Sequence, residues 1–185
     1  MLKNFILVFL ILFSISNPTY ASIKKKIINN LTKTDNLEFE FKQTIGEKTE
    51  NGNCIIQYPK KIYCSYENTK KIMVSNGKYL VIKNLNNNQY YNYQLKKTPL
   101  ELLLDKNFLI SQINILESRD VDDKYIGFTI PNNKNKINIF FDKKTLKLTG
   151  WQTEDIYKNL VITYIYNLKL NQNIDRNKFK LPKMN

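Results

Sequence analysis

Carboxylate pairs are the residues of this sequence whose spacing best suits acid–base chemistry. The chain has no histidine among its 185 residues, which excludes a Ser-His-Asp or Cys-His catalytic arrangement and a histidine-ligated metal site. Two carboxylates can still serve as general acid and base. The pairs are Glu38 with Glu40, Asp122 with Asp123, and Glu154 with Asp155. The first pair lies on the polar face of an alternating strand and the others lie in or beside turns. We therefore expect solvated surfaces, no enzyme activity, no cofactor and no metal.

Two cysteines could form a disulfide. Cys54 and Cys64 flank a segment with Pro59 at its midpoint. In a β-hairpin centred on Pro59, Cys54 lies directly opposite Cys64, and opposed Cα atoms about 4.5 Å apart are within disulfide reach. The alternative is two buried thiols, or a hairpin whose register is shifted by one residue. Two cysteines without histidine make an incomplete set of metal ligands.

The positive charge of the chain comes almost entirely from lysine. Lys and Arg number 29 and Asp and Glu 16, which gives a formal charge of +13. Only Arg119 and Arg176 are arginines, and the lysine clusters are spread along the whole chain. Nucleic-acid-binding domains gather basic residues on one face, so we expect no nucleic-acid partner. A basic polyanion-binding protein stays as a less favoured alternative.

The N-terminus has the pattern of a secretory signal peptide. Lys3 precedes an apolar run from Phe5 to Phe13, and a small-residue site ends at Ala21. This run is about half as long as the ~20 apolar residues of a membrane-spanning helix. We predict a signal peptide over residues 1–21, cleaved after Ala21, and one exported domain over residues 22–185. Export would place the cysteines in an oxidising compartment.

The elements that must position these residues are mostly β-strands. Apolar residues from Ile23 to Leu31 recur on one side of a helix predicted over residues 22–33. Leu37, Phe39 and Phe41 then alternate with charged residues over 36–45, which indicates a half-buried strand. We expect a turn over 46–52 and strands on both sides of Pro59. Further strands are predicted over 71–75, 78–82, 89–95, 112–118, 124–130, 136–141, 147–153 and 159–170. An antiparallel sheet of about ten or eleven strands must curl or close.

Residues 98–105 interrupt the strand pattern. Thr98 is a candidate N-cap, Pro99 suits the first helical position, and leucines follow. Phe108 continues the apolar stretch. Because the segment is too apolar for an exposed loop, we expect a short helix that covers one mouth of the curled sheet.

Several stretches, taken in order, resemble the motifs of one known family. They are Phe41-Lys42-Gln43 followed by Gly52-x-x-Ile55-x-x-Tyr58-Pro59-Lys60-Lys61-Ile62, then Lys71-Ile72-Met73-Val74-Ser75-Asn76-Gly77-Lys78-Tyr79-Leu80, then Thr98-Pro99-Leu100-x-Leu102-Leu103, and finally Phe179-Lys180-Leu181-Pro182. The ordered set is similar to the periplasmic outer-membrane lipoprotein carrier proteins, the LolA family. It spans nearly all of residues 22–185.

The resemblance implies a mainly β fold, an incomplete and strongly curved antiparallel β-barrel with an N-terminal helix and a short helical lid. It implies a periplasmic carrier, expected to be a monomer, rather than an enzyme. Such carriers accept acylated lipoproteins from an inner-membrane lipoprotein-releasing ABC transporter. They shield the acyl chains in an apolar concave cavity and deliver the cargo to an outer-membrane receptor or to the membrane itself.

The resemblance also turns the apolar pattern into a candidate site. Alternation assigns to the cavity Leu37, Phe39, Phe41, Ile56, Tyr58 and Ile62, on the same face as Cys54 and Cys64. The underside of the lid is expected to comprise Leu100, Leu103, Leu104 and Phe108. Without the resemblance, a dry hydrophobic core would be the simpler interpretation of all these residues.

Tyr58 departs from the family pattern. Family members often carry an arginine at this position that hydrogen-bonds the lid, whereas a tyrosine hydroxyl donates a single uncharged hydrogen bond. We therefore expect a weaker or different lid contact. A carrier of another lipid or amphiphile on the same fold remains an alternative. An outer-membrane lipoprotein receptor is disfavoured, because no cysteine near Ala21 could carry a lipid.

Overall fold

A computed structural model describes residues 18–87, 89–131, 136–155 and 158–184 of the chain. Residues 1–17 of the predicted signal peptide lie outside these ranges, and residues 18–21 form the first turn of a helix. The predicted cleavage and domain boundaries therefore stay predictions. Within the described residues, no helix is both long enough and apolar enough to span a membrane.

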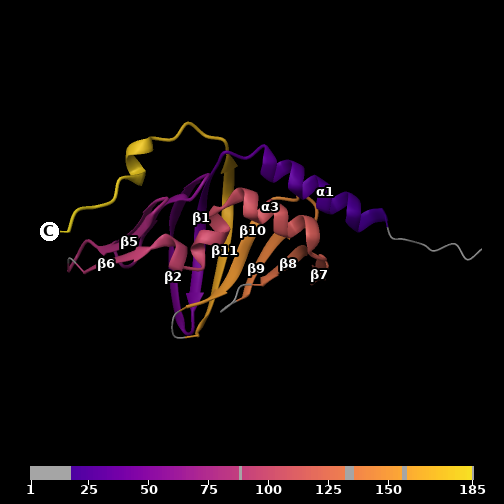
Figure 1. Cartoon of the computed structure of the whole chain (residues 1–185). Helices are drawn as coiled ribbons and strands as arrows, with labels where there is room; N and C mark the ends of the chain where they lie inside the picture. The colour runs from indigo at the N-terminus through magenta and orange to yellow at the C-terminus, as the bar shows by residue number, and fades with distance from the viewer. Residues whose placement is uncertain (1–17, 88, 132–135, 156–157, 185) are drawn as a thin grey trace, which may run out of the picture.

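One antiparallel sheet dominates the structure (Figure 1). Over the described residues it has eleven strands in the order β6-β5-β4-β3-β2-β1-β11-β10-β9-β8-β7. The strands are β1 (Asn36–Ile45), β2 (Lys48–Gln57), β3 (Lys61–Tyr66), β4 (Lys71–Asn76), β5 (Tyr79–Asn84), β6 (Tyr90–Gln94), β7 (Arg119–Val121), β8 (Tyr125–Pro131), β9 (Lys136–Asp142), β10 (Leu148–Glu154) and β11 (Leu160–Leu170). Because β6 and β7 are the two edges, the barrel is not closed. The predicted fold class is confirmed.

Three helices lie on one face of the sheet. They are α1 (Pro18–Thr32), α2 (Leu100–Leu104) and α3 (Lys106–Ile115), and α1 runs beside α3 (Figure 1). The strands bury alternate residues toward these helices, such as Leu37, Phe39 and Phe41 in β1. Alternation of this kind is what a strand needs to bury one face while the other stays polar.

The C-terminal segment lies against the first half of the sheet. After β11 the chain forms a short 3-10 helix, η2 (Arg176–Phe179), which contacts β3 and β4. Phe179 is buried there, and Lys83 of β5 donates a hydrogen bond from Nζ to the Lys183 carbonyl oxygen at 3.0 Å. Val74 and Val81 are buried without belonging to the cluster beneath the helices, so the segment covers the opposite, outer face of these strands.

The structure corrects three local predictions. The strand predicted over 112–118 is wrong, because Gln112 to Ile115 are the last residues of α3. Residues two positions apart share a face of a strand, whereas in α3 Ile113 is buried and Ile115 is 71% exposed. The predicted turn over 46–52 is shorter, since β2 begins at Lys48. Pro99, rather than Thr98, is the N-cap of α2.

Candidate functional site

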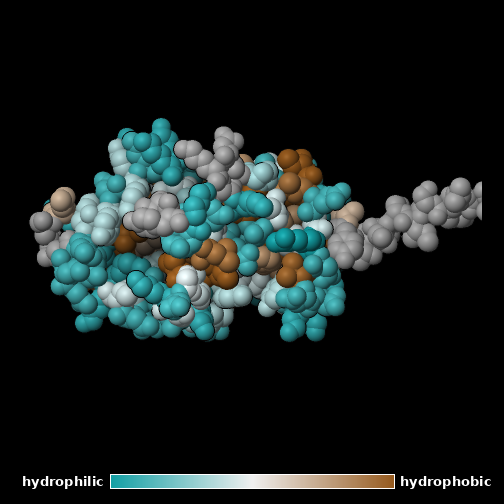
Figure 2. All heavy atoms as spheres, turned by 90° about the horizontal axis from the view of Figure 1, so that it is seen from below, coloured by the Kyte–Doolittle hydropathy of each residue, from teal (hydrophilic) through white to brown (hydrophobic). Residues whose placement is uncertain are grey.

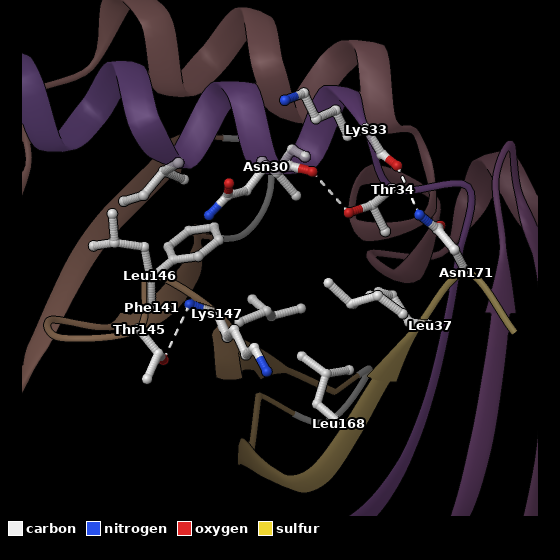
Figure 3. A pocket seen from close by; sticks show the side chains of 14 residues that line it. Asn30, Lys33, Thr34, Leu37, Phe141, Thr145, Leu146, Lys147, Leu168 and Asn171 are labelled. Carbon is white, nitrogen blue, oxygen red and sulfur yellow. Dashed lines mark hydrogen bonds between the residues drawn. The ribbon is translucent and has the colours of Figure 1, made fainter.

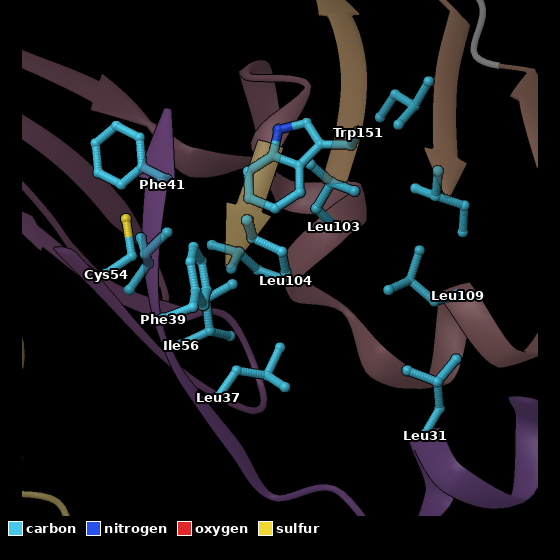
Figure 4. Packing of buried hydrophobic residues seen from close by; sticks show 14 of the residues in the cluster. Leu31, Leu37, Phe39, Phe41, Cys54, Ile56, Leu103, Leu104, Leu109 and Trp151 are labelled. Atoms are coloured by element: carbon cyan, nitrogen blue, oxygen red, sulfur yellow. The ribbon is translucent and has the colours of Figure 1, made fainter. Parts of the chain in front are cut away.

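The space between the helices and the sheet gathers the residues assigned to the cavity and the lid. Five of the cavity residues and two of the lid residues are buried in one hydrophobic cluster; they are Leu37, Phe39, Phe41, Ile56, Ile62, Leu103 and Leu104. Tyr58, Leu100 and Phe108 are partly buried and pack against it. Figure 4 shows Leu103 and Leu104 of α2 beside Phe39 of β1 and Trp151 of β10. The sequence therefore identified residues that meet in space.

The first three strands present their apolar residues in matching rows. The register pairs Leu37 with Ile56 and Ile56 with Ile62. The Phe39 row continues through Cys54 to Cys64, which are joined by a disulfide with Cα atoms 4.1 Å apart. Directly opposed residues share a face of the sheet, so the pairing expected for a hairpin centred on Pro59 is the one in the structure.

One end of this face is closed by aromatic and charged groups. The ring of Phe41 lies edge-on to that of Tyr66, with centroids 5.0 Å apart. Lys71 places Nζ 3.9 Å from the Tyr66 ring centroid and 2.8 Å from each carboxylate oxygen of Glu50. Burial, with a smaller contribution from Glu50, raises the pKa of Tyr66. An uncharged tyrosine thus separates the ion pair from the apolar interior.

Gly52 allows the close packing at this point. A Cβ atom there would lie 2.0 Å from the Ser65 carbonyl oxygen and 2.9 Å from the Phe41 ring. Both distances are far inside van der Waals contact, so only glycine lets the Phe41 ring rest on β2.

A mainly apolar cavity of about 270 Å³ lies at the other end, between α1 and the last strands (Figure 3). Its lining includes Ile27 and Leu31 of α1 and Leu37 of β1, and it also includes Lys33 and Lys147. On the sheet side it is lined by Phe141, Leu146, Leu148, Leu168 and Leu170. These five residues of the second half of the chain were not anticipated from the sequence as part of the site.

A β-bulge explains why sequence alternation missed Leu168 and Leu170. Ile165 faces the interior opposite Phe41, so simple alternation would turn Leu168 and Leu170 outward. The register shifts between Glu38 and Glu40, and Asn167 has a positive φ of 51°. This extra residue reverses the alternation and turns both leucines inward. In the sequence, the indication of this bulge is Asn167 itself, because asparagine tolerates a positive φ.

Lys60 ties the lid to the turn between β2 and β3. Its backbone N–H donates to the Leu104 carbonyl oxygen at 2.8 Å. Its Nζ lies 3.0 Å from Oε1 of Glu101 and 3.2 Å from Oδ2 of Asp105. Hydrogen bonding to Glu101 and then to Asp105 raises the pKa of Lys60 above its ordinary value. Lys60, two residues after Tyr58, therefore supplies both a backbone and a charged contact to α2, and the expectation for Tyr58 stays a prediction.

Two further lysines tie α3 to the N-terminal helix and its following loop. Lys24 of α1 donates from Nζ to the carbonyl oxygens of Asn114 and Leu116 at 3.0 and 3.1 Å, at the C-terminal end of α3. Lys106, at the first position of α3, donates to the Thr34 carbonyl oxygen at 2.9 Å. Cations near a helix C-terminus also complement the helix dipole. The helices therefore contact the rest of the protein through polar bonds at their ends and apolar side chains beneath.

Hydrophobic residues also lie on one face of the molecule. Figure 2 views the molecule from below and shows hydrophobic residues gathered near the middle of this face, within a surround of hydrophilic residues. The chemistry that this lining offers is the reversible burial of apolar groups. Among the described residues, no group of three or more Cys, Asp or Glu side chains is arranged to hold a metal ion.

A family model matches most of the chain. Residues 32–182 match the family described as "Outer membrane lipoprotein carrier protein LolA". No curated protein sequence matches the chain.

Solved structures share the fold at low sequence identity. A putative outer membrane lipoprotein-sorting protein domain from Vibrio parahaemolyticus has a TM-score of 0.50 and 9% identity, covering 88% of this chain and 96% of that one. An uncharacterized conserved protein from Thermus thermophilus has a TM-score of 0.52 and 6% identity, with 88% and 94% covered. MucB has a TM-score of 0.51 and 8% identity, covering 91% of this chain and 65% of MucB. Likeness at this identity shows a common fold.

Proposed function

This chain belongs to the LolA family of outer membrane lipoprotein carrier proteins, and we propose that it carries lipoproteins across the periplasm with their acyl chains buried in its concave face. The observation that supports this most is the continuous apolar lining beneath a separate set of helices. Each CH₂ group removed from water stabilises the bound state by about 0.8 kcal/mol. The cluster beneath the helices contains no charged residue, which suits that task.

Binding requires the helices to move away from the sheet. The cavity of about 270 Å³ is smaller than the roughly 300–1,000 Å³ typical of sites that enclose small ligands. The remaining interior is filled by side chains such as Leu103, Leu104 and Phe39, which are almost completely buried. We therefore propose that this arrangement is the closed state of the carrier, and that α2 and α3, together with α1 over the cavity, are the segments that would open.

The route of the cargo is part of the same proposal. We propose that an inner-membrane lipoprotein-releasing ABC transporter supplies the lipoprotein and that an outer-membrane receptor or the membrane receives it. Family membership supports a periplasmic location for this exchange. The net charge of +13 would favour approach to anionic membrane surfaces and acidic partners, with an association rate that falls with salt.

Mass spectrometry of the protein purified from the periplasm tests the proposal. A co-purified polypeptide with acyl chains at its N-terminus is expected. Phospholipid or fatty acid in its place would support the alternative carrier of another amphiphile, and an empty protein that binds polyanions tightly would overturn the proposal.

A pair of variants tests whether the cargo binds in the cavity. Leu168→Lys puts a charge in the apolar lining and should reduce the amount of bound cargo. Ile115→Lys, on α3 at a side chain that is 71% exposed and outside the cavity lining, serves as the matched control and should leave it unchanged. Equal loss in both variants would contradict binding in this cavity.

A further inference from the structure

The two edges of the sheet differ in how they meet solvent. The β7 edge is three residues long and carries two charged residues, Arg119 and Asp120. The β6 edge has the sequence Tyr90-Tyr91-Asn92-Tyr93-Gln94, without charge or proline, and its last four residues are exposed. Charges, prolines and short length are the usual means by which proteins prevent pairing at an edge. The β6 edge lacks charge and proline.

The register shows which backbone groups of β6 face outward. Two flanking hydrogen bonds, from the Asn84 N–H to the Gln89 carbonyl oxygen and from the Leu95 N–H to the Lys78 carbonyl oxygen, fix the phase of the ladder with β5. Because hydrogen-bonded and non-bonded pairs alternate along an antiparallel ladder, Tyr91 and Tyr93 bond to β5. The N–H and C=O groups of Tyr90, Asn92 and Gln94 point away from it.

Side chains and charge around this edge suit a particular partner. Tyr91 and Tyr93, opposite Ile82 and Leu80, face the concave side and are 47% and 39% exposed. Residues 78–97 contain four lysines and no acidic residue; Lys78, Lys96 and Lys97 are exposed. Glu101, which shares a surface hollow with Lys78 and Lys96, is paired with Lys60.

We propose that β6 is a docking edge for an extended, acidic segment of a partner polypeptide, which adds to the sheet as a further strand. Backbone hydrogen bonds to Tyr90, Asn92 and Gln94 give affinity, and alternate side chains of the segment contact Tyr91 and Tyr93. Acidic residues on the segment meet the lysines that flank the edge. This site goes beyond acyl-chain binding, because a peptide without a lipid is sufficient to occupy it.

The first test uses a synthetic peptide of about ten residues that alternates valine and glutamate. Added to the wild-type protein, it is expected to slow hydrogen exchange at the amides of Tyr90, Asn92 and Gln94. The amides of Tyr91 and Tyr93 already bond to β5 and should change little. Absence of binding, or protection that avoids β6, would overturn the proposal. Equal affinity for a peptide with lysine in place of glutamate would overturn its acidic character.

Two substitutions at one position isolate the backbone bond. Asn92→Pro removes an outward-facing N–H, which an edge strand tolerates, whereas Asn92→Ala keeps it. Asn92→Pro should bind the peptide about tenfold more weakly, and Asn92→Ala should bind like the wild type. Thermal unfolding of both variants checks that they fold, and the exchange pattern of the wild type does not depend on them.

Two measurements distinguish this edge from the acyl-chain cavity and from a dimer contact. Acyl-chain binding should be the same in both variants, so a failure of the carrier function would leave the peptide result unaffected. Unchanged peptide affinity in Asn92→Pro would overturn the proposal. A wild-type dimer that Asn92→Pro dissolves would also overturn it, because a second copy would then occupy the edge.

Discussion

Replacing Lys60 by methionine should open the lid without unfolding the protein. The change keeps an unbranched side chain that is one atom shorter and removes its charge. It leaves the bond from the residue 60 N–H to the Leu104 carbonyl oxygen, which is 2.8 Å long. What is lost is the contact of Nζ with Glu101 at 3.0 Å and with Asp105 at 3.2 Å.

The size of the effect follows from the exposure of these groups. The side chains of Lys60, Glu101 and Asp105 are 33%, 24% and 29% exposed. Exposed ion pairs contribute about 0.2–1 kcal/mol each, and buried hydrogen bonds to charged groups about 1.5–3 kcal/mol. Two partly exposed contacts should therefore stabilise the closed lid by about 1–2 kcal/mol in total. That difference raises the population of the open lid by a factor of about 5–30.

Hydrogen exchange at the residue 60 N–H measures this population. This N–H donates to the Leu104 carbonyl oxygen, so its bond joins the β2–β3 turn to α2 and breaks when α2 moves away. After correction for the intrinsic rate of the new residue, its exchange should be about 5–30 times faster in Lys60→Met. Amides in β1 and β11 should exchange as in the wild type, because the sheet stays intact.

Lys61→Met is the matched control, since Lys61 is the next residue and has no ion pair within the described part of the chain. It should leave exchange at the Lys60 N–H unchanged. Exchange that is equal in Lys60→Met and the wild type, or equally fast in both variants, would refute the reasoning.

The contacts of the Lys60 side chain with Glu101 and Asp105 depend on pH, and the sign of this dependence is defined. Hydrogen bonding raises the pKa of Lys60 above 10.5. Its stabilising contribution is therefore complete below about pH 10.5 and is lost as the pH rises through the folded-state value. Between about pH 7 and about pH 9, the ratio of the open-lid populations of Lys60→Met and the wild type should stay constant, because Lys60 keeps its charge over this range.

Three other changes probe the remaining contacts. Tyr58→Ala should loosen the lid because it removes a ring packed against the cluster; unchanged exchange of the lid amides would count against it, and Tyr58→Phe should behave as the wild type. Reducing the bond between Cys54 and Cys64, which closes a loop with a sequence separation of 10, should lower the free energy of unfolding by about 2–3 kcal/mol in urea titrations. A smaller loss would show that the hairpin is already ordered in the unfolded chain. Asp142 accepts hydrogen bonds from the Thr145 and Lys144 N–H groups, which lower its pKa. Its contribution to folding stability should be present above about pH 4 and lost as the pH falls through the lowered pKa. Asp142→Ala should remove that part of the acid dependence of the unfolding temperature.

The strands of the first half of the sheet could be predicted because local and tertiary signals agree there. The alternation of Leu37, Phe39 and Phe41 gives both the strand and its buried face, and the residues 36–45 predicted for it are the bounds of β1. The position of Pro59 between two cysteines gives the register of the next hairpin. These features depend on neighbours in the sequence or directly across a hairpin.

The rest depends on geometry that the sequence does not display. Asn167 reverses the alternation of β11 by a bulge, so Leu168 and Leu170 join the cavity. The lid latch depends on Lys60 having a φ of 64°, in the left-handed region. This backbone turn directs a lysine toward α2 that local pattern would place on an exposed turn. The cation that contacts α2 therefore lies two residues after Tyr58, at a position that the sequence alone does not single out.

The arrangement of apolar and polar contacts explains how a tight core could still admit a lipid. Opening the lid without cargo exposes side chains such as Leu103 and Leu104 to water, at about 25 cal/mol for each Å² of apolar surface. In the proposed carrier, acyl chains that enter would cover the same surface, so that one apolar contact would replace another. The free-energy difference between the closed, empty protein and the loaded protein then depends mainly on polar contacts that the cargo does not replace. These are the hydrogen bonds and ion pairs of Lys60, Lys24 and Lys106. This arrangement suits a carrier that must release its cargo. Polar contacts of about 1–2 kcal/mol can be replaced by contacts with a partner, so that a partner can shift the equilibrium between the closed and open states.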